Sequence, residues 1–335
     1  MGVTITQVAA RAGVSTITAS RVFSNPSLVA ERTKEKVLQA AQELGYMPHR
    51  SARALRNGRT HTIGVLTADT HQVISVLKIE ALHREIAQRG YDLHLLNQQQ
   101  IEKNKDASLL TTCYGAIEGL VLVYVQDGPV LNDVRALMAA GVPVVSLEHV
   151  KDLEVDVVTA DYAAGAYQAT RYLLQRGRAP VGLVLIGWNI EVNWRREAGY
   201  RRAVEEAGLE PMVFVLPPSK DSLFAQGYRG VERALDARPR PASLLFPDDE
   251  MAVGALRCLK DEGIPVPEVM AVIGWDNLPL CDYVDPRLSS LTAPVEETVA
   301  LAIERLFARL NGDHSQPAVQ LVQPELVVRH SCGGD

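Results

Sequence analysis

The hydrophobic positions from residue 62 onward fall into short, nearly uninterrupted runs that are separated by longer amphipathic stretches. The runs have the length and the β-branched content of buried parallel strands; examples are TIGVLTA, GLVLVYV, PVGLVLIG and VMAVIGW. Between them, stretches such as VISVLKIEALHREIAQRG and WRREAGYRRAVEEAG carry apolar residues at helical spacing. This alternation predicts an α/β body with parallel sheets, in which ligand sites lie at the carboxyl ends of the strands.

The strand runs form two sets that separate near residue 160. Segments within 288–330 are expected to cross back between the two sets. We therefore predict a body of residues 62–335 with two lobes around a cleft, as in periplasmic sugar-binding proteins. The N-lobe is expected to comprise about 62–160 and 289–320, and the C-lobe about 161–288 and 321–335.

The first 47 residues have a different pattern, with small side chains and short helical segments. Thr4 and Gln7 have the spacing of a helix capping box, and Gly13 ends the helix they begin. Ser15 is an N-cap for a second helix that runs through about Phe23. A third helix is expected at 31–44, with Val37, Leu38, Ala41 and Leu44 turned inward. Two short helices joined by a tight glycine turn predict a helix-turn-helix, thin enough for its second helix to enter a major groove of about 12 Å.

The charge distribution bears on the function of this head. An ordinary helical hairpin with an exposed polar face would show the same periodicity. Residues 1–60, however, hold nine Lys/Arg against three acidic residues, so the remainder of the chain, whose total net charge is -6, carries -12. A basic module on an acidic body favours DNA binding.

Several other classes of protein are disfavoured. The N-terminus lacks the pattern of a signal peptide, and no apolar run is long enough to span a membrane, so we expect a cytoplasmic protein. The four cysteines and eight histidines show no metal-ligand spacing, and no nucleotide-binding or nucleophile motif is present. We therefore expect neither a metal, nor a cofactor, nor an enzyme.

Two segments resemble a known family. VTITQVAARAGVSTITASRVFSNPSLV and TKEKVLQAAQELGYMPHRSARALRNGRTHTIGVL resemble the head, linker and first core strand of LacI/GalR-type bacterial transcription regulators. The resemblance implies that Thr16, Ile17 and Arg21 face base edges, a role in which arginine pairs well with guanine. It also implies phosphate contacts for a second set of residues: Thr4, Ser15, Ser20 and Asn25. Ala30 departs from the family, which usually has a serine N-cap there, a loss of about 1 kcal/mol.

The linker, residues 48–61, is too short and too polar to be a stable helix alone. It resembles the family's hinge helix, which orders when two subunits meet on DNA. By this resemblance Leu55 inserts into the minor groove, Ala54 packs on the partner helix and Arg56 lies near phosphate or a groove edge. A solvated linker with Leu55 packed on the body is the alternative.

Family markers in the body indicate the ligand site. WRREAGY matches R-x-x-G-Y and implies that Arg196 grips an effector; GWDN implies that Asp276 accepts from ligand hydroxyls. Asp248 stands where the family usually has Asn, and a carboxylate there disfavours anionic ligands. Glu148 occupies the place of a frequent Asp.

Tryptophan side chains near these markers could stack on a sugar ring or a base: Trp188, Trp194 and Trp275. Each residue of the site also has a structural alternative. A tryptophan in an α/β lobe is often part of the core, Arg196 could pair with a neighbouring acid, and Asp276 could cap a turn.

Together these features predict a homodimeric transcription regulator, most readily a repressor, that binds a pseudo-palindromic DNA operator. The effector in its cleft is expected to be a sugar or nucleoside. The alternative function is a cytoplasmic sugar sensor that acts on protein partners and carries a vestigial head.

Overall fold

The computed structural model describes residues 3–24, 28–46, 59–68, 72–104, 108–187 and 190–334. The chain divides into two compact units, Met1–His61 and Thr62–Asp335. Each unit has its own core, and each is described separately below.

The first unit contains the three helices that the sequence predicts: α1 (Ile5–Ala12), α2 (Thr16–Ser24) and α3 (Glu31–Leu44). The capping box at the start of α1 is confirmed, since the Thr4 backbone N–H donates to Gln7 Oε1 over 2.8 Å. Ser15 caps α2, accepting from the Thr18 N–H at 3.1 Å, and Gly13 adopts a left-handed φ of 66° between the helices. At Ala30 no side chain caps α3, as the sequence indicates.

The small core of this unit is made largely of alanine and valine: Val8, Ala9, Ala19, Val22, Val37, Ala40 and Ala41. Leu44 packs against it, but the expectation for Leu38 is wrong, because that side chain is 43% exposed. Leu38 follows Val37 directly, and a rotation of 100° carries it past the edge of the buried stripe.

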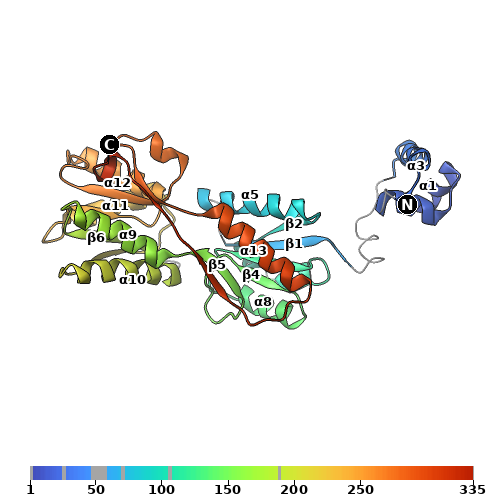
Figure 1. The fold of residues 1–335 in the computed structure, drawn as a ribbon, viewed down its shortest axis with the longest axis horizontal. Coiled ribbons are helices and arrows are strands. Elements are labelled where there is room, and N and C mark those ends of the chain that lie inside the picture. The colour runs from blue at the N-terminus through green and yellow to red at the C-terminus, as the bar shows by residue number, and fades with distance from the viewer. Residues whose placement is uncertain are drawn as a thin grey trace. The chain divides into compact units, whose positions relative to one another are not determined.

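The second unit contains two six-stranded sheets flanked by helices (Figure 1). The N-lobe sheet has the order β11-β5-β4-β3-β1-β2 and the C-lobe sheet the order β12-β10-β9-β8-β6-β7. All of the pairings are parallel except that of β10 with β12. The predicted α/β body with two parallel-sheet lobes is confirmed.

The elements of the N-lobe have the following bounds: β1 Thr62–Thr67, α5 Val73–Gln88, β2 Asp92–Asn97, α6 Gln98–Lys103, α7 Leu109–Cys113, β3 Gly119–Val123, α8 Val130–Ala139, β4 Val144–Ser146, β5 Asp156–Ala160, α13 Val295–Leu310 and β11 Val319–Val322. The helices α5 and α13 pack together on one face of the sheet, and α7 and α8 cover the other (Figure 1).

The elements of the C-lobe have the following bounds: α9 Tyr162–Gln175, β6 Val181–Ile186, α10 Ile190–Glu206, β7 Met212–Leu216, α11 Leu223–Leu235, β8 Ser243–Leu245, α12 Asp249–Asp261, β9 Ala271–Asp276, β10 Ser289–Thr292 and β12 Leu326–Val327. The pair α9 and α10 covers one face of this sheet and the pair α11 and α12 the other.

One predicted lobe boundary needs correction. The sequence placed 289–320 in the N-lobe, but β10 pairs with β9 and Leu291 lies in the C-lobe core. The chain therefore crosses to the N-lobe after β10 and returns after β11. Ser290 explains the difference, because its hydroxyl donates to buried Asp249 in the C-lobe at 2.6 Å.

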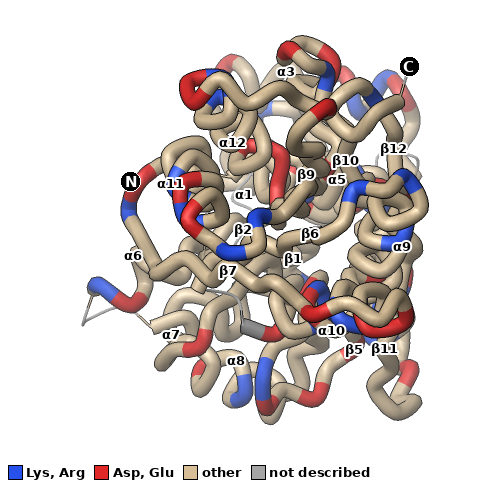
Figure 2. The backbone as a smooth tube through the Cα atoms, turned by 90° about the vertical axis from the view of Figure 1, so that its left-hand side faces the viewer, with Lys and Arg blue, Asp and Glu red and all other residues tan. Residues whose placement is uncertain are grey.

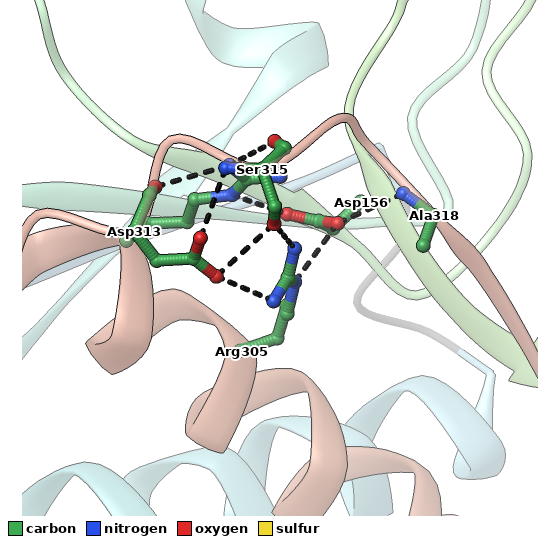
Figure 3. A network of polar contacts seen from close by, with 6 residues as sticks. Asp156, Arg305, Asp313, Ser315 and Ala318 are labelled. Carbon is green, nitrogen blue, oxygen red and sulfur yellow. Dashed lines mark hydrogen bonds and ion pairs between the residues drawn. The ribbon is translucent and has the colours of Figure 1, made fainter.

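The crossing segment is anchored in the N-lobe by a polar network around Asp156, the first residue of β5 (Figure 3). The Asp156 carboxylate is 2% exposed and accepts from Arg309 Nε at 2.7 Å and from the Ala318 N–H at 3.0 Å. Arg305 Nε lies 3.0 Å from the same carboxylate. Burial raises the pKa of Asp156, but these hydrogen bonds outweigh burial and hold the pKa below its ordinary value. The network thus fixes both ends of the α13–β11 connection to β5.

The surface charges of the body are of both signs, with Lys/Arg and Asp/Glu interspersed along its helices (Figure 2). On α10 this arrangement forms pairs four residues apart, such as Arg201 with Glu197 and Arg202 with Glu206. Such exposed pairs each contribute only about 0.3–0.5 kcal/mol. Among the described residues, no helix is both long enough and apolar enough to cross a membrane.

Candidate functional sites

The first candidate site is the exposed face of α2. Ala19 and Val22 point into the core of the head, so the opposite face of this helix is open to solvent. That face carries Thr16, Ile17, whose side chain is 67% exposed, and Arg21. Thr4 and Ser15 are exposed at the helix ends nearby, and Ser20 is partly exposed. The described residues with expected DNA contacts are thus accessible to solvent; the remaining four, Asn25, Ala54, Leu55 and Arg56, lie outside the described residues.

The second candidate site is the cleft between the lobes, to which the carboxyl ends of both sheets contribute. Tyr124 follows β3 and Glu148 follows β4 in the N-lobe. Asp248 follows β8 and Asp276 ends β9 in the C-lobe. Parallel strands bring their carboxyl ends to one edge, which explains why residues so distant in sequence converge.

Arg196 is positioned by the rest of its R-x-x-G-Y motif. A Cβ on Gly199 would lie 1.9 Å from the Ala163 carbonyl oxygen, so only glycine lets α10 pack this closely on α9. The Tyr200 hydroxyl donates to the Val181 carbonyl at 2.7 Å and accepts from the Met212 N–H at 2.7 Å, which fixes α10 to the sheet. One turn earlier, the Arg196 guanidinium lies over the rings of Tyr162 and Trp275, at 4.8 and 4.7 Å from their centroids.

Arg196 is only 9% exposed, and its buried Nε has no hydrogen-bond partner among the described residues. Its contacts with Tyr162 and Trp275 are cation–π contacts, which use the face of the guanidinium and give the Nε–H no acceptor. A buried guanidinium in this state is prepared to bind an acceptor from a ligand.

The GWDN segment (274–277) and the PDDEMA segment (247–252) pack closely against each other. A Cβ on Gly274 would lie 2.3 Å from Asp249 Oδ1, so glycine leaves room for that carboxylate. Asp249 accepts from the Ser290 hydroxyl at 2.6 Å and from the Leu278 N–H at 2.7 Å. The bonds of Asp249 thus fix the loop after Asp276, whose own backbone is strained at a φ of 103°.

Burial changes the acidity of two carboxyl groups in the cleft. It raises the pKa of Asp248 to about 7, although the capping bond from the Met251 N–H (2.7 Å) and the charge of Arg196 lower it. Burial, followed by the charges of Asp249 and Asp248, raises the pKa of Asp276 well above its ordinary value. Near neutral pH Asp248 is therefore partly protonated, whereas an exposed carboxylate would be ionised.

Glu148 lies in the cleft but is fully engaged. Its Oε1 accepts from Lys78 Nζ at 2.7 Å and from the Tyr162 hydroxyl at 2.8 Å, and its Oε2 accepts from the Thr159 hydroxyl at 2.9 Å. Burial lowers the pKa of Lys78, but the charge and hydrogen bond of Glu148, together with the charges of Tyr162 and Asp276, outweigh burial and raise the pKa above its ordinary value. Glu148 and Lys78 are therefore a buried ion pair, and the Tyr162 hydroxyl extends it from the N-lobe to the C-lobe.

The tryptophans of the site differ in their surroundings. Trp275 is 1% exposed and packs in the C-lobe core, 5.5 Å from the Tyr162 ring, while presenting its face to Arg196. Trp194 is 61% exposed, and Trp188 lies outside the described residues. The structure brings Arg196, Asp248, Asp276 and Trp275 together with Glu148, while Trp194 is turned to solvent.

Three further residues of the cleft were missed from the sequence: Lys78, Tyr124 and Tyr162. With Trp275 and Asp276 they line a cavity whose remaining free volume is only about 10 Å³, close to that of one water molecule. Lys78 Nζ lies 4.2 Å from the centroid of the Tyr124 ring. Lysine and tyrosine at these positions belong to no local motif, so only the tertiary structure reveals them. Within the described part of the chain, no group of His, Cys, Asp and Glu could hold a metal ion.

An exposed helix-turn-helix surface together with a two-lobed α/β body that carries a polar cleft defines the class of ligand-controlled DNA-binding regulators. Family comparisons agree for both units. Residues 4–49 match the bacterial regulatory proteins of the lacI family, and residues 170–332 match the periplasmic binding protein-like domain.

Whole-chain relatives extend this agreement. The transcriptional regulator GntR of Pseudomonas aeruginosa is 31% identical over 334 residues, which cover 98% of this chain and 95% of that protein. The transcriptional repressor PurR of Pasteurella multocida is 30% identical, with 98% of both chains covered. The chain therefore belongs to the lacI family of bacterial regulatory proteins: it is a DNA-binding transcriptional regulator of the repressor type with an effector-binding body, and not an enzyme.

Solved structures show the same fold. The complex of the transcriptional regulator CelR with cellobiose has a TM-score of 0.72 at 26% identity and covers 98% of this chain and 99% of that one. The lac repressor dimer bound to operator and anti-inducer has a TM-score of 0.83, with 99% of both chains covered. Because the lac repressor is only 24% identical to this chain, this similarity shows the fold alone.

The acidity of Asp248 predicts an unusual pH dependence of stability. Its pKa is about 7 in the native protein and about 3.9 in an unfolded chain. Between these values the native carboxyl binds more protons, so its contribution to the free energy of unfolding grows as pH falls from 8 to 5, by on the order of 2 kcal/mol. We expect Asp248→Asn, which keeps the helix cap, to flatten the pH dependence of urea unfolding over this range. The raised pKa of Asp276 acts in the same direction, so part of the pH dependence remains in the Asp248→Asn variant.

The matched control is Asp127→Asn at an exposed position. It should follow the wild-type curve. A curve for Asp248→Asn that parallels the wild type from pH 8 to pH 5 would contradict the assignment of this effect to Asp248.

Proposed function

We propose that the protein is a homodimer that represses transcription from a pseudo-palindromic operator and is controlled by a sugar or nucleoside held between its lobes. It would act in the cytoplasm and associate with the nucleoid when bound to DNA. The observation that carries the proposal is the buried Arg196 guanidinium, which lies near Asp276 and whose Nε has no acceptor in the described part of the chain. A polyhydroxylated ligand would supply acceptors to Arg196 and donors to Asp276.

In this proposal the residues of the cleft have different roles. Arg196 and Asp276 bind ligand hydroxyls, the free oxygen of Asp248 accepts from one more, and Trp275 supports the guanidinium from below. Glu148 acts indirectly by holding Lys78 and Tyr162. Trp194, exposed at 61%, would have to turn inward to contact a ligand.

The mechanism rests on the connection between the cleft and the linker. Ligand binding changes the relative orientation of the two N-lobes in the dimer, and the linkers, with Leu55, then no longer pair on DNA. A ligand that prefers this arrangement lowers DNA affinity by a coupling free energy of typically about 1–3 kcal/mol. A sensor that acts only on protein partners would not need the exposed polar face of α2, so we favour the DNA-directed function.

The dimer proposal is supported by an apolar stripe on the outer face of α5. Val73, Val76 and Leu77 are 38%, 49% and 37% exposed and share one face of the helix, and Leu95 on edge strand β2 is 44% exposed. Clustered exposed apolar residues of this kind usually mark an interface between proteins.

The first prediction concerns base reading by the head. Arg21→Ala should weaken binding to the operator by about 1–3 kcal/mol, a factor of about 5–150, because a bidentate contact with guanine is lost. Lys36→Ala, an exposed residue on α3, is the matched control. Fluorescence anisotropy on operator and scrambled duplexes measures both. Equal losses for Arg21→Ala on the two duplexes would show that Arg21 contacts only the backbone.

The second prediction concerns the dimer. Leu77→Asp places a charge in the centre of the proposed interface and should convert the dimer to monomers, weakening self-association by roughly 30-fold or more. Leu209→Asp, at an equally exposed leucine of the C-lobe (37%), should leave the dimer intact. Sedimentation velocity distinguishes the two species. A Leu77→Asp protein that remains dimeric would place the interface elsewhere.

A further inference from the structure

Lys78 gives the cleft a second buried cation. The side chain extends from the inner face of α5 and is only 6% exposed, with its ammonium 2.7 Å from Glu148 Oε1 and 4.2 Å from the Tyr124 ring centroid. An ammonium carries three N–H donors, and Glu148 accepts one of them. Because lysine is rarely buried this deeply, its position in a ligand cleft calls for an explanation.

The ion pair with Glu148 explains only part of the burial of Lys78 in the cleft. The Glu148 carboxylate already accepts from the hydroxyls of Tyr162 and Thr159 as well as from Lys78. It therefore has little capacity left for a ligand. The donors left in the cleft are those of Lys78 and those of Arg196, whose Nε is buried without a partner among the described residues.

Lys78 and Arg196 act on the same space. The charges of both lower the pKa of Asp276 and that of Tyr162, so both cations lie near these two side chains. Lys78, Tyr162 and Asp276 line the same cavity, and Arg196 covers its Tyr162 and Trp275 walls. The cavity has room for about one oxygen atom, and a ligand oxygen placed there would contact both cations.

The acids of the cleft leave N–H donors of these cations unused. One oxygen of Asp248 is used to cap α12, where it accepts from the Met251 N–H at 2.7 Å. Burial raises the pKa of Asp248 to about 7, so this carboxyl is partly protonated near neutral pH, and burial also raises the pKa of Asp276. The anion exclusion expected from Asp248 in the sequence is weakened accordingly, while Lys78 keeps donors beyond the one that Glu148 accepts and Arg196 Nε has no acceptor among the described residues.

We propose that the effector carries an acid group, a carboxylate or a phosphate, and that Lys78 is the specificity-determining residue that receives it beside Arg196. A neutral polyol would occupy Arg196 and Asp276 but would offer no negative charge to the Lys78 donors that Glu148 does not use. An oxyanion forms charge-assisted hydrogen bonds with both and satisfies the orphaned guanidinium. The inference rests on the proposed effector site and narrows the sugar or nucleoside to a sugar acid, a sugar phosphate or a nucleotide.

The test uses the full chain and defined probes. Thermal unfolding and isothermal titration are carried out with acetate, with phosphate and with glycerol, a neutral polyol of similar size, at ionic strength held constant with chloride. Glucose, glucuronate and glucose 6-phosphate then form a set with and without an acid group. Acetate and phosphate distinguish a carboxylate site from a phosphate site.

We expect saturable stabilisation by acetate or phosphate but not by glycerol, and at least tenfold tighter binding of glucuronate or glucose 6-phosphate than of glucose. The variant Lys78→Met with Glu148→Gln removes both charges of the ion pair, so neither is left buried alone, and should lose this preference. Lys260→Met, on the exposed side of α12, should retain it.

Three results would overturn the proposal: no saturable response to acetate and phosphate, glucose binding as tightly as its acidic counterparts, or an unchanged anion preference in the double variant. Operator binding is measured on the same samples. If the protein binds its operator but prefers glucose, only the inference that the effector carries an acid group is overturned. If the folded protein selects no operator, the proposed function itself is overturned.

Discussion

The body of this protein depends on one buried ion pair, between Glu148 and Lys78, which lies where its two sheets converge. Glu148, which follows β4, pairs with Lys78 of α5 within the N-lobe, and the Tyr162 hydroxyl joins the pair from the first turn of α9 in the C-lobe. A buried carboxylate without these donors would be costly, so the interaction restricts how the lobes can approach one another. The close contact of α10 with α9 at Gly199 then carries Arg196 over Tyr162, and the arrangement of the side chains in the cleft follows from that placement.

This arrangement suggests why the site combines rigid and adaptable parts. Asp249 fixes the loop that presents Asp276, and the network around Asp156 holds the crossing segment to the N-lobe. Two other residues of the cleft are not held in this way. Arg196 Nε has no hydrogen-bond partner among the described residues, and the backbone of Asp276 is strained. A ligand can lower the free energy of such groups by binding to them. A ligand that bridges the lobes through these groups would alter the relative orientation of the lobes.

The sequence predicted what short-range chemistry determines. Thr4 with Gln7, Ser15 and the glycines at 13 and 45 define the helices of the head, because caps and left-handed turns depend on neighbouring residues. Apolar runs likewise predicted the strands of both lobes. Lys78, Tyr124 and Tyr162 escaped notice because nothing in their local pattern distinguishes a cleft residue from a surface or core residue. The lobe of β10 was misassigned because its pairing with β9 and the burial of Leu291 in the C-lobe core are long-range contacts that the local pattern does not reveal.

The central claim is that a symmetric pair of heads reads DNA under the control of the body, and selection of bound duplexes from a random pool at moderate salt tests it most directly. We expect enrichment of a pseudo-palindrome with a fixed central step, whose affinity falls steeply with rising salt as phosphate contacts are lost. A folded, dimeric protein that enriches no sequence would contradict it.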